Sequence, residues 1–464
     1  MKIKEFVNYK LYIKILKILI LIYPLTFIFG NPAINLSTLL IILLGLISFK
    51  KTLFHFDDKR IILFFGLFFL IVLFSTVFEV IKNGHYDDWI KAILYLRFFL
   101  LMIVIKELIR SGMLKINDFI LACLVITGIV AIDLTVQFIF GKNLIGIEPI
   151  YLNTETVYFT GIFNEELIAG GFILMFSILG IFSLPLIFKN IKKMYLLLIS
   201  IIVTSFYFFT ILLSGNRMPV IMFLVFLIML SIFVKKKQYR SLFYGVSLIL
   251  LIISSISIFS SDNLKKRYGS FYEGIPNPLN VIKKLQINYP ELDKFKGSGK
   301  QFINLPINKS EKKYELMSFH TGHSSIYLTS LDLFIDDPII GKGIKSFRNN
   351  CNNKVYLPNR VCESHPHNFI LEILNDTGII GLMTILIPVL ILLINLYKEY
   401  LLGEGRRNNI SNWIYLSIIM CLLTHFFPFK STGSFFSTFN STYIFLIIGF
   451  SLGLNEIKHR NTNK

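Results

Sequence analysis

The segment SHPHNFILEILNDTGIIGL, residues 364–382, is where the longest polar region of the chain passes back into apolar sequence. Counted from His367 at about 100° per residue, one stripe of a helix stays within about 40° of this histidine. The stripe contains Leu371, Leu374, Gly378 and Gly381. In a membrane helix such glycines let a neighbouring helix approach closely, so the spacing predicts a clamped helix that holds His367 above the bilayer surface. The alternative is that His365 and His367 only bind backbone carbonyls at an interface.

The composition of the whole chain indicates a membrane protein. Of its 464 residues, 54% are hydrophobic and 16% are charged, and the mean hydropathy is +0.66. An ordinary soluble domain is excluded by these values. The formal charge of +19 comes from Lys and Arg in short clusters between apolar runs, which is typical of residues that set membrane topology. We expect no nucleic-acid partner, because no basic stripe with interleaved aromatic residues forms.

Apolar windows long enough to cross a bilayer predict an all-α, polytopic integral membrane protein of about 12 transmembrane helices. The windows lie near residues 11–29, 33–49, 61–81, 89–109, 117–140, 166–188, 194–213, 218–234, 241–260, 377–397, 412–429 and 439–454. The expected organisation is helices 1–9 in residues 1–260, a large polar cap in 261–366 and helices 10–12 in 367–464.

The distribution of basic residues predicts the orientation in the membrane. An even number of spans puts both ends of the chain on one side. The loops on that side hold clusters such as Lys50 with Lys51, Lys106 with Arg110 and Lys115, Lys189 with Lys192 and Lys193, and Lys235 to Lys237. The short loops on the other side hold one basic residue each: Lys82, Lys142, Arg217 and Lys430. Because Lys and Arg gather in cytoplasmic loops, we expect the cap to face the periplasm of a bacterial inner membrane.

The predicted cap contains a possible disulfide close to the histidines. Ten residues separate Cys351 from Cys362 in the same exported loop, and an oxidising compartment would allow them to pair. Two free thiols are the alternative. A bridge would hold the backbone that leads into His365. The preceding segment, residues 324–337, has the apolar spacing of an amphipathic helix that ends at Pro338.

The histidine segment also carries a family resemblance. His367 and Asn368 are followed after nine residues by Gly378 and after two more by Gly381. This pattern resembles the H-[NSQ]-x9-G-x-x-G signature of the O-antigen ligase and O-antigen polymerase family, complete in spacing and residue type. The resemblance implies a glycosyltransferase whose donor glycan is carried by undecaprenyl diphosphate. It also implies His367 as general base, His365 as a supporting group and Asn368 as a substrate contact.

Two arginine positions extend the resemblance. Arg217, in the outer turn SGNR, is similar to an outer-face arginine of the family, which implies a diphosphate contact. The alternative is an arginine that reaches lipid headgroups. The family typically has a second arginine ahead of a P-x-x-G-x-G turn, which matches residues 338–343, but residues 321–323 read Thr-Gly-His here. The candidates for the second phosphate ligand are therefore His320, His323, Lys342, Lys345 and Arg348, with Arg348 preferred.

The segment before the sixth window resembles a G-x-F-x-x-E stretch of the family. The resemblance makes Glu165 and its neighbour Glu166 candidates for binding sugar hydroxyls. The alternative is that they only favour a helix start through the macrodipole. Nearby histidines could offer ligands to zinc, but no pair has the spacing of a zinc signature, so we expect neither a metal nor another cofactor.

The chemistry of such a transfer can be stated from the residues. A polyprenyl diphosphate leaving group needs its developing charge neutralised, which Arg217 and a second cation can do. An acceptor hydroxyl needs a base at the moment of attack, and His367 fits that role. In-line displacement would invert the anomeric carbon. The first hypothesis is ligation to a lipid A-core acceptor, and the second is polymerisation of lipid-linked repeat units. A transporter or flippase is more distant, because neither a duplicated half nor interrupted helices in matched positions are evident.

Overall fold

The computed structural model of the chain describes residues 3–84, 87–151, 157–235, 237–260, 264–265, 268, 322–357, 360–402 and 411–462. Most of the predicted cap lies outside these residues, whereas its last part, from α15 onward, is described. The described residues are helical apart from loops and one antiparallel pair of short strands. The pair consists of β1 (Ile150–Tyr151) and β2 (Val157–Tyr158), with Ile150 opposite Tyr158.

The helices follow the predicted windows closely. The first part of the chain forms α1 (Ile3–Leu21), α2 (Tyr23–Thr26), α3 (Gly30–Phe49), η1 (Lys50–Phe54), α4 (Lys59–Asn83), α5 (Asp87–Tyr95), α6 (Arg97–Arg110), α7 (Ile116–Phe140), η2 (Gly161–Phe163), α8 (Ala169–Ile181), α9 (Leu184–Ile187), α10 (Lys193–Ser214), α11 (Arg217–Phe233) and α12 (Lys237–Ser260). The remainder forms α15 (Gly322–Asp336), α16 (Phe347–Asn350), η6 (Cys351–Lys354), α17 (Phe369–Leu402), α18 (Asn412–His425) and α19 (Thr438–Thr462).

Each of the twelve windows contains a helix or two successive helices. Two of the windows are divided near a proline, and the short second helix then begins with that proline at its first or second position, as in α2 and α9. Six helical stretches in the described part of the chain are long and apolar enough to cross a membrane. These are Gly30–Phe54, Lys59–Lys82, Ile116–Phe140, Ala169–Ile187, Lys193–Ser214 and Phe369–Leu402. The chain is therefore a multi-pass, all-α membrane protein.

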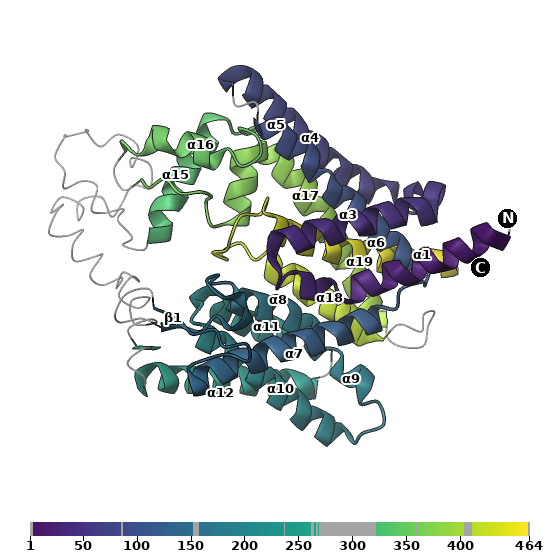
Figure 1. Cartoon of the computed structure of the whole chain (residues 1–464), viewed down its shortest axis with the longest axis vertical. Helices are drawn as coiled ribbons and strands as arrows, with labels where there is room; N and C mark the ends of the chain where they lie inside the picture. The colour runs from purple at the N-terminus through teal and green to yellow at the C-terminus, as the bar shows by residue number, and fades with distance from the viewer. Residues whose placement is uncertain are drawn as a thin grey trace, which may run out of the picture.

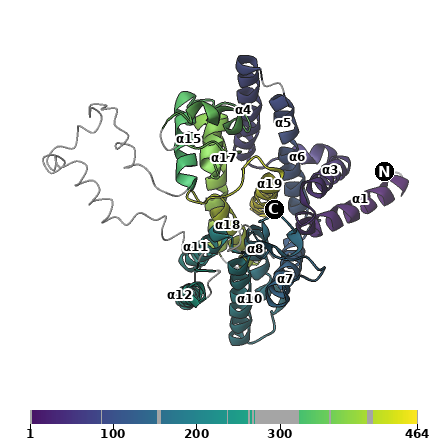
Figure 2. The ribbon, with the colours of Figure 1, turned by 60° about the vertical axis from the view of Figure 1, so that its left-hand side comes forward.

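The arrangement of the helices has two sides. Figure 1 shows the start of α1 and the end of α19 together on one side, and α15 and α16 at the opposite side, next to α17. Both ends on one side is what an even number of crossings requires. Turning the molecule shows α19 near the middle of the bundle (Figure 2), where it packs against α6, α3, α17 and α18.

The contact between α6 and α19 is unusually close because glycines line it. A Cβ atom added at Gly449 would lie 2.8 Å from Cβ of Ile105, and one added at Gly453 would lie 2.5 Å from Cβ of Ile109. Small residues on one face allow two membrane helices to approach in this way. The close approach predicted for the glycines of residues 364–382 is thus used between these two helices instead.

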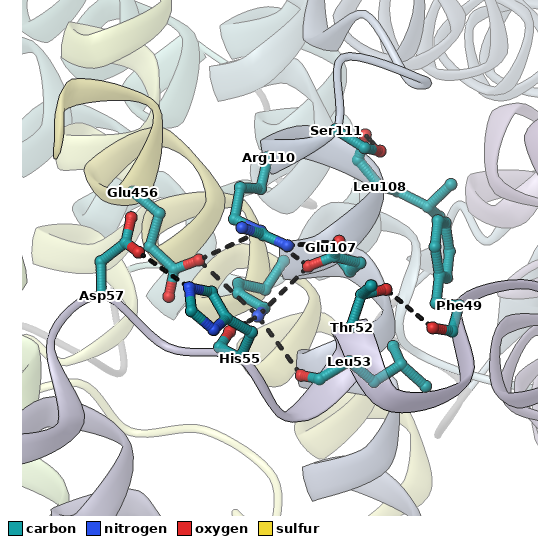
Figure 3. A network of polar contacts seen from close by, with 11 residues as sticks. Phe49, Thr52, Leu53, His55, Asp57, Glu107, Leu108, Arg110, Ser111 and Glu456 are labelled. Carbon is teal, nitrogen blue, oxygen red and sulfur yellow. Dashed lines mark hydrogen bonds and ion pairs between the residues drawn. The ribbon is translucent and has the colours of Figure 1, made fainter. Parts of the chain in front are cut away.

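A buried cluster of charges joins α6 to α19 near the side that holds the chain ends (Figure 3). The Lys106 ammonium lies 3.4 Å from Glu107 and 3.6 Å from Glu456, and it donates to the carbonyl of His55 at 2.7 Å. Arg110 makes a two-pronged contact with Glu107, at 2.7 and 2.8 Å. Two cations thus balance two carboxylates. Lys106 and Arg110 belong to this neutral cluster inside the bundle, so they are weaker orientation signals than the sequence suggested.

Candidate functional site

The histidine segment does not continue the stripe of a helix, so that part of the prediction is wrong. The Asn368 side-chain oxygen accepts from the amides of Ile370 and Leu371 at 3.0 and 3.1 Å. This is the bonding of a helix N-cap, and α17 accordingly begins at Phe369. His367 therefore precedes the helix, with a φ of 54° in the left-handed region. Its carbonyl accepts from the Thr432 amide at 2.8 Å, which ties the turn to the loop between α18 and α19.

The side-chain nitrogen of Asn368 bonds to the same loop. Its amide nitrogen donates to the carbonyl of Pro428 at 2.7 Å and, more weakly, to that of Lys430 at 3.4 Å. The residue is buried. Its contacts describe a side chain that fixes the backbone under His367, and the substrate contact implied by the resemblance has no support from these bonds.

The helix that follows is broken at Gly378, which has a φ of 65° and a ψ of −171°. The turn at residues 338–343 inserts at the break. Before the break, the carbonyls of Asn375 and Asp376 accept from the amides of Lys342 and Gly343 at 2.8 and 2.9 Å. After the break, the amide of Ile379 donates to the carbonyl of Pro338 at 2.9 Å.

Gly378 is needed at the break for two reasons. A Cβ there would lie 2.1 Å from the Ile339 carbonyl oxygen, and its backbone conformation is essentially restricted to glycine. The neighbour that approaches this glycine is thus a loop backbone, whereas the sequence pattern predicted a helix. At Gly381, an added Cβ would meet the Thr377 side chain of its own helix at 2.0 Å. Gly378 therefore serves the junction between α17 and the cap, whereas Gly381 serves the packing of α17 on itself.

Three histidine rings gather above this junction. The ring centroids of His365 and His367 are 4.0 Å apart, and those of His323 and His367 are 5.0 Å apart. His323 is in the first turn of α15, so the cluster joins two segments of the cap. Nδ1 of His365 bonds the Ser364 hydroxyl at 2.8 Å, whereas its buried Nε2 has no hydrogen-bond partner among the described residues.

Burial and neighbouring charges keep these imidazoles neutral. Burial lowers the pKa of His367, and the nearby Glu363 carboxylate partly opposes that shift. The pKa of His365 falls further, to about 4, through burial, then through His367 and Arg348. A neutral imidazole can accept a proton, and one whose pKa is less depressed is the stronger base. These shifts favour His367 over His365 as the base.

Arginine charges act on two of the three rings. The pKa of His323 is lowered by burial, then by His367 and by the Arg217 guanidinium. Arg348 lowers the pKa of His365. Burial lowers the pKa of the neighbouring Lys345, and Arg348 lowers it further. Arg217 and Arg348 therefore act within one electrostatic neighbourhood, although 131 positions separate them in the chain (348 − 217). A cluster of this kind favours an anionic ligand.

The turn that carries Arg217 is held in place by hydrogen bonds of the preceding residue. Arg217 is the first residue of α11 and is half-buried. The preceding residue, Asn216, donates to the carbonyl of Leu167 at 2.9 Å and accepts from the amide of Gly170 at 3.2 Å. These bonds attach the arginine turn to the start of α8.

Glu165 lies in the turn before α8 and is exposed. Among the described residues, no hydrogen bond or ion pair joins it to the histidines. Its role as a sugar ligand stays a prediction. Two charged residues of the apolar helices have separate partners. Arg97 donates to the carbonyl of Leu94 and to the hydroxyl of Thr438, whereas Asp133 accepts from the side chain of Asn143 and the amide of Leu144.

A disulfide holds the cap next to the histidines. Cys351 and Cys362 are bonded, with Cα atoms 5.0 Å apart. Cys351 also packs with Ile326, Leu333 and Phe347 in a small hydrophobic core separate from that of the bundle. The bridge therefore links the short helices after α15 to the segment that leads into the histidine turn.

Two acidic residues of α17 were missed by the sequence analysis. The Glu372 carboxylate accepts from the Ser434 hydroxyl and the Phe435 amide. The Asp376 carboxylate accepts from the Ser346 hydroxyl at 2.9 Å and from the amides of Ser346 and Lys345. Both carboxylates are buried and four residues apart in an apolar helix, a spacing visible in the sequence. They fasten the loops that carry Lys345 and Thr432 to α17.

No group of three His, Cys, Asp or Glu side chains within the described ranges is arranged to hold a metal ion. His320, a candidate ligand from the sequence, lies outside those ranges.

Comparison with known families gives an independent result. Residues 202–386 match the family described as O-antigen ligase (Wzy_C). No curated protein sequence matches the chain. The matched range runs from α10 into α17, so it includes the Arg217 turn, the three histidines and the break at Gly378. Over residues 202–386, the chain is therefore similar to the O-antigen ligase family.

Proposed function

We propose that the protein is a glycosyltransferase that moves a glycan from undecaprenyl diphosphate to a lipid A-core acceptor at the periplasmic face of the inner membrane. The observation that carries the proposal is the convergence of His323, His365 and His367 with the charges of Arg217 and Arg348. The similarity of residues 202–386 to the O-antigen ligase family supports a membrane transferase of lipid-linked glycans. The residue roles and the acceptor are inferred from chemistry.

In this proposal Arg217 binds the diphosphate of the donor. A guanidinium presents a planar pair of N–H donors that match two phosphate oxygens, and its charge opposes the negative charge that develops as the diphosphate leaves. Arg348 is the second cation, with Lys345 close enough to contribute. Their placement near the histidines supports transfer at one site, because donor and acceptor must meet there.

His367 removes the proton from the acceptor hydroxyl. The oxygen forms a bond to the anomeric carbon while the bond from that carbon to the diphosphate oxygen breaks, and the configuration inverts. The proton is held on His367 and the diphosphate carries the negative charge away. The ring of His365 supports that of His367, and the two ring centroids are 4.0 Å apart. Glu363 favours the protonated form of His367, as a partner of a general base should.

Polymerisation of lipid-linked repeat units is the second candidate, because it uses the same donor chemistry and the same family contains it. A transporter or flippase is a more distant candidate. The polar residues singled out here gather at one end of the bundle, whereas transporters carry their sites near the bilayer midplane.

The lipid-linked intermediates of cells that lack the protein test these functions against one another. A ligase predicts that full-length glycan accumulates on the carrier at the periplasmic face. Accumulation of single repeat units would favour the polymerase, and glycan retained on the cytoplasmic side would favour the flippase. Normal completion of glycan on lipid A-core in such cells would overturn the ligase proposal.

A further inference from the structure

A cavity lies far from the histidine site, between α8, α9, α10, α11, α12 and α18. It is partly open, and its empty volume is about 750 Å³ with the solvent space at the opening included. Its walls are mainly apolar and include Phe182, Leu197, Phe226, Leu230, Val246 and Trp413. The hydroxyl of Ser200, which also lines it, is satisfied by the carbonyl of Leu196 at 2.8 Å. The lining therefore suits an apolar chain, because it is mainly apolar and the Ser200 hydroxyl already has a hydrogen-bond partner.

The depth of the cavity corresponds to one leaflet of a bilayer. On α10 the lining extends from Lys193 to Thr204. At about 1.5 Å per residue this is roughly 16 Å, or about half of the roughly 30 Å hydrocarbon core. A single acyl chain entering from one surface would therefore fit its length.

The helix ends that meet at the cavity mouth belong to the predicted cytoplasmic side. α10 begins at the mouth, at Lys193, and α18 begins there, at Asn412, whereas α12 begins on the same predicted side, at Lys237. α11 ends there, at Phe233. The basic loops on which the orientation rests join these ends. The leaflet assigned below thus rests on the membrane orientation in the proposed function.

Charge at the mouth is positive. Lys193 is the one charged residue among the described residues that line the cavity, and it is exposed. It is also the first residue of α10, and Trp413 is the second residue of α18. Two helix N-termini therefore lie at the mouth together with an ammonium group, an arrangement that favours a phosphate. Tryptophan is the side chain that most often lies at headgroup level.

We propose that this cavity binds an anionic glycerophospholipid of the cytoplasmic leaflet, with one acyl chain between α10, α11 and α12 and the phosphate beside Lys193. Such a lipid would fill space that the side chains leave open and would join five membrane helices. One of them, α11, carries Arg217 at its opposite end. Lipid occupancy would therefore stabilise the bundle that supports the arginine turn.

The test measures retained lipid directly and does not use transfer activity, so its outcome is independent of the ligase proposal. The full chain, purified in detergent, is titrated with phosphatidylglycerol or with phosphatidylcholine, and bound lipid is counted by native mass spectrometry. We expect tighter binding of phosphatidylglycerol. Lys193→Gln should weaken that binding about fivefold, the effect of one basic residue at a membrane surface, and should weaken the binding of phosphatidylcholine less, because choline balances the charge of its phosphate.

Two further variants control the result. Lys192→Gln removes an exposed neighbour that does not line the cavity, and it should retain the wild-type preference. Ser200→Phe should fill the cavity and reduce the binding of both lipids. Size-exclusion chromatography first checks that this variant elutes as a folded, monodisperse species. Equal binding of the two lipids by the wild type, equal effects of the two lysine variants, or stronger binding of polyprenyl phosphate than of phosphatidylglycerol would overturn the proposal.

Discussion

At the scale of single residues, His367 lies just before α17 in a left-handed backbone conformation, because Asn368 caps the helix. Asparagine before an apolar run is a recognised helix-start signal, and an N-cap at Asn368 predicts a helix that begins at Phe369, after His367. The grouping of His323 with His365 and His367 could be suggested only by the family pattern, because α15 and the histidine turn are joined by tertiary packing. The roles of Glu372 and Asp376 likewise depend on loops that are distant in sequence.

The pH dependence of transfer follows from the lowered pKa of His367. The base works in its neutral form, so the rate should be flat at and above neutral pH. Because burial moves the pKa below its ordinary value of 6.5, the rate should fall only as the pH decreases through a midpoint below 6.5. Initial rates with saturating donor, measured from pH 4.5 to 8.5, check this. A midpoint above 6.5 would contradict the assigned environment of His367.

Arg217 should matter through its geometry as well as its charge. Arg217→Ala should nearly abolish transfer, because the diphosphate loses its main cation. Arg217→Lys should keep a small part of the activity, since an ammonium cannot bind two phosphate oxygens as a planar fork. Transfer rates at matched membrane levels of the proteins measure both effects. Wild-type rates in the lysine variant would leave only electrostatic attraction as the role of this residue.

At the scale of elements, the helix positions were predictable and the break in α17 was not. The windows for α3, α7 and α10 agree with the helices to within a few residues, because long apolar runs specify membrane helices strongly. Gly378 fitted a helical stripe equally well. Its role became visible only with the 338–343 turn beside it, since the break is stabilised by hydrogen bonds to that turn.

The break predicts a strong effect of a small substitution. Gly378→Ala should destabilise the junction by at least about 1 to 3 kcal/mol, the usual cost of such a backbone conformation for a non-glycine residue, before the contact with Ile339 is added. The thermal melting temperature in detergent and the transfer rate should both fall. Gly66→Ala in α4, where an added Cβ has nothing within 4 Å, is the matched control and should have little effect. Equal melting temperatures for the two variants would argue against the break.

At the scale of the whole molecule, hydropathy and charge clusters predicted a many-helix membrane protein with both chain ends on one side, as Figure 1 shows. They could not predict that Lys106 and Arg110 pair with Glu107 and Glu456 inside the bundle (Figure 3), because Glu456 belongs to α19 and approaches only in the folded state. The cavity beside Lys193 also arises from the packing of several helices and has no local sequence signal.

The orientation is testable with reporters fused to truncated chains. Fusions after Lys51, Lys193 and Lys237 should report a cytoplasmic location, and fusions within residues 265–360 should report a periplasmic one. The reason is the asymmetry of basic residues between the two sets of loops. A cytoplasmic result for the long loop would put Arg217 and the histidines in the wrong compartment.

The central claim is that His367 is the general base of a glycan transfer, and purified enzyme tests it most directly. Transfer from a lipid-diphosphate donor is measured in detergent with EDTA present, for wild type, His367→Ala and His365→Ala, together with donor binding. We predict that His367→Ala lowers the rate by about 10² to 10⁴-fold, the usual share of a general base, with donor binding retained and a smaller loss for His365→Ala. Full transfer by the His367→Ala protein would contradict the account.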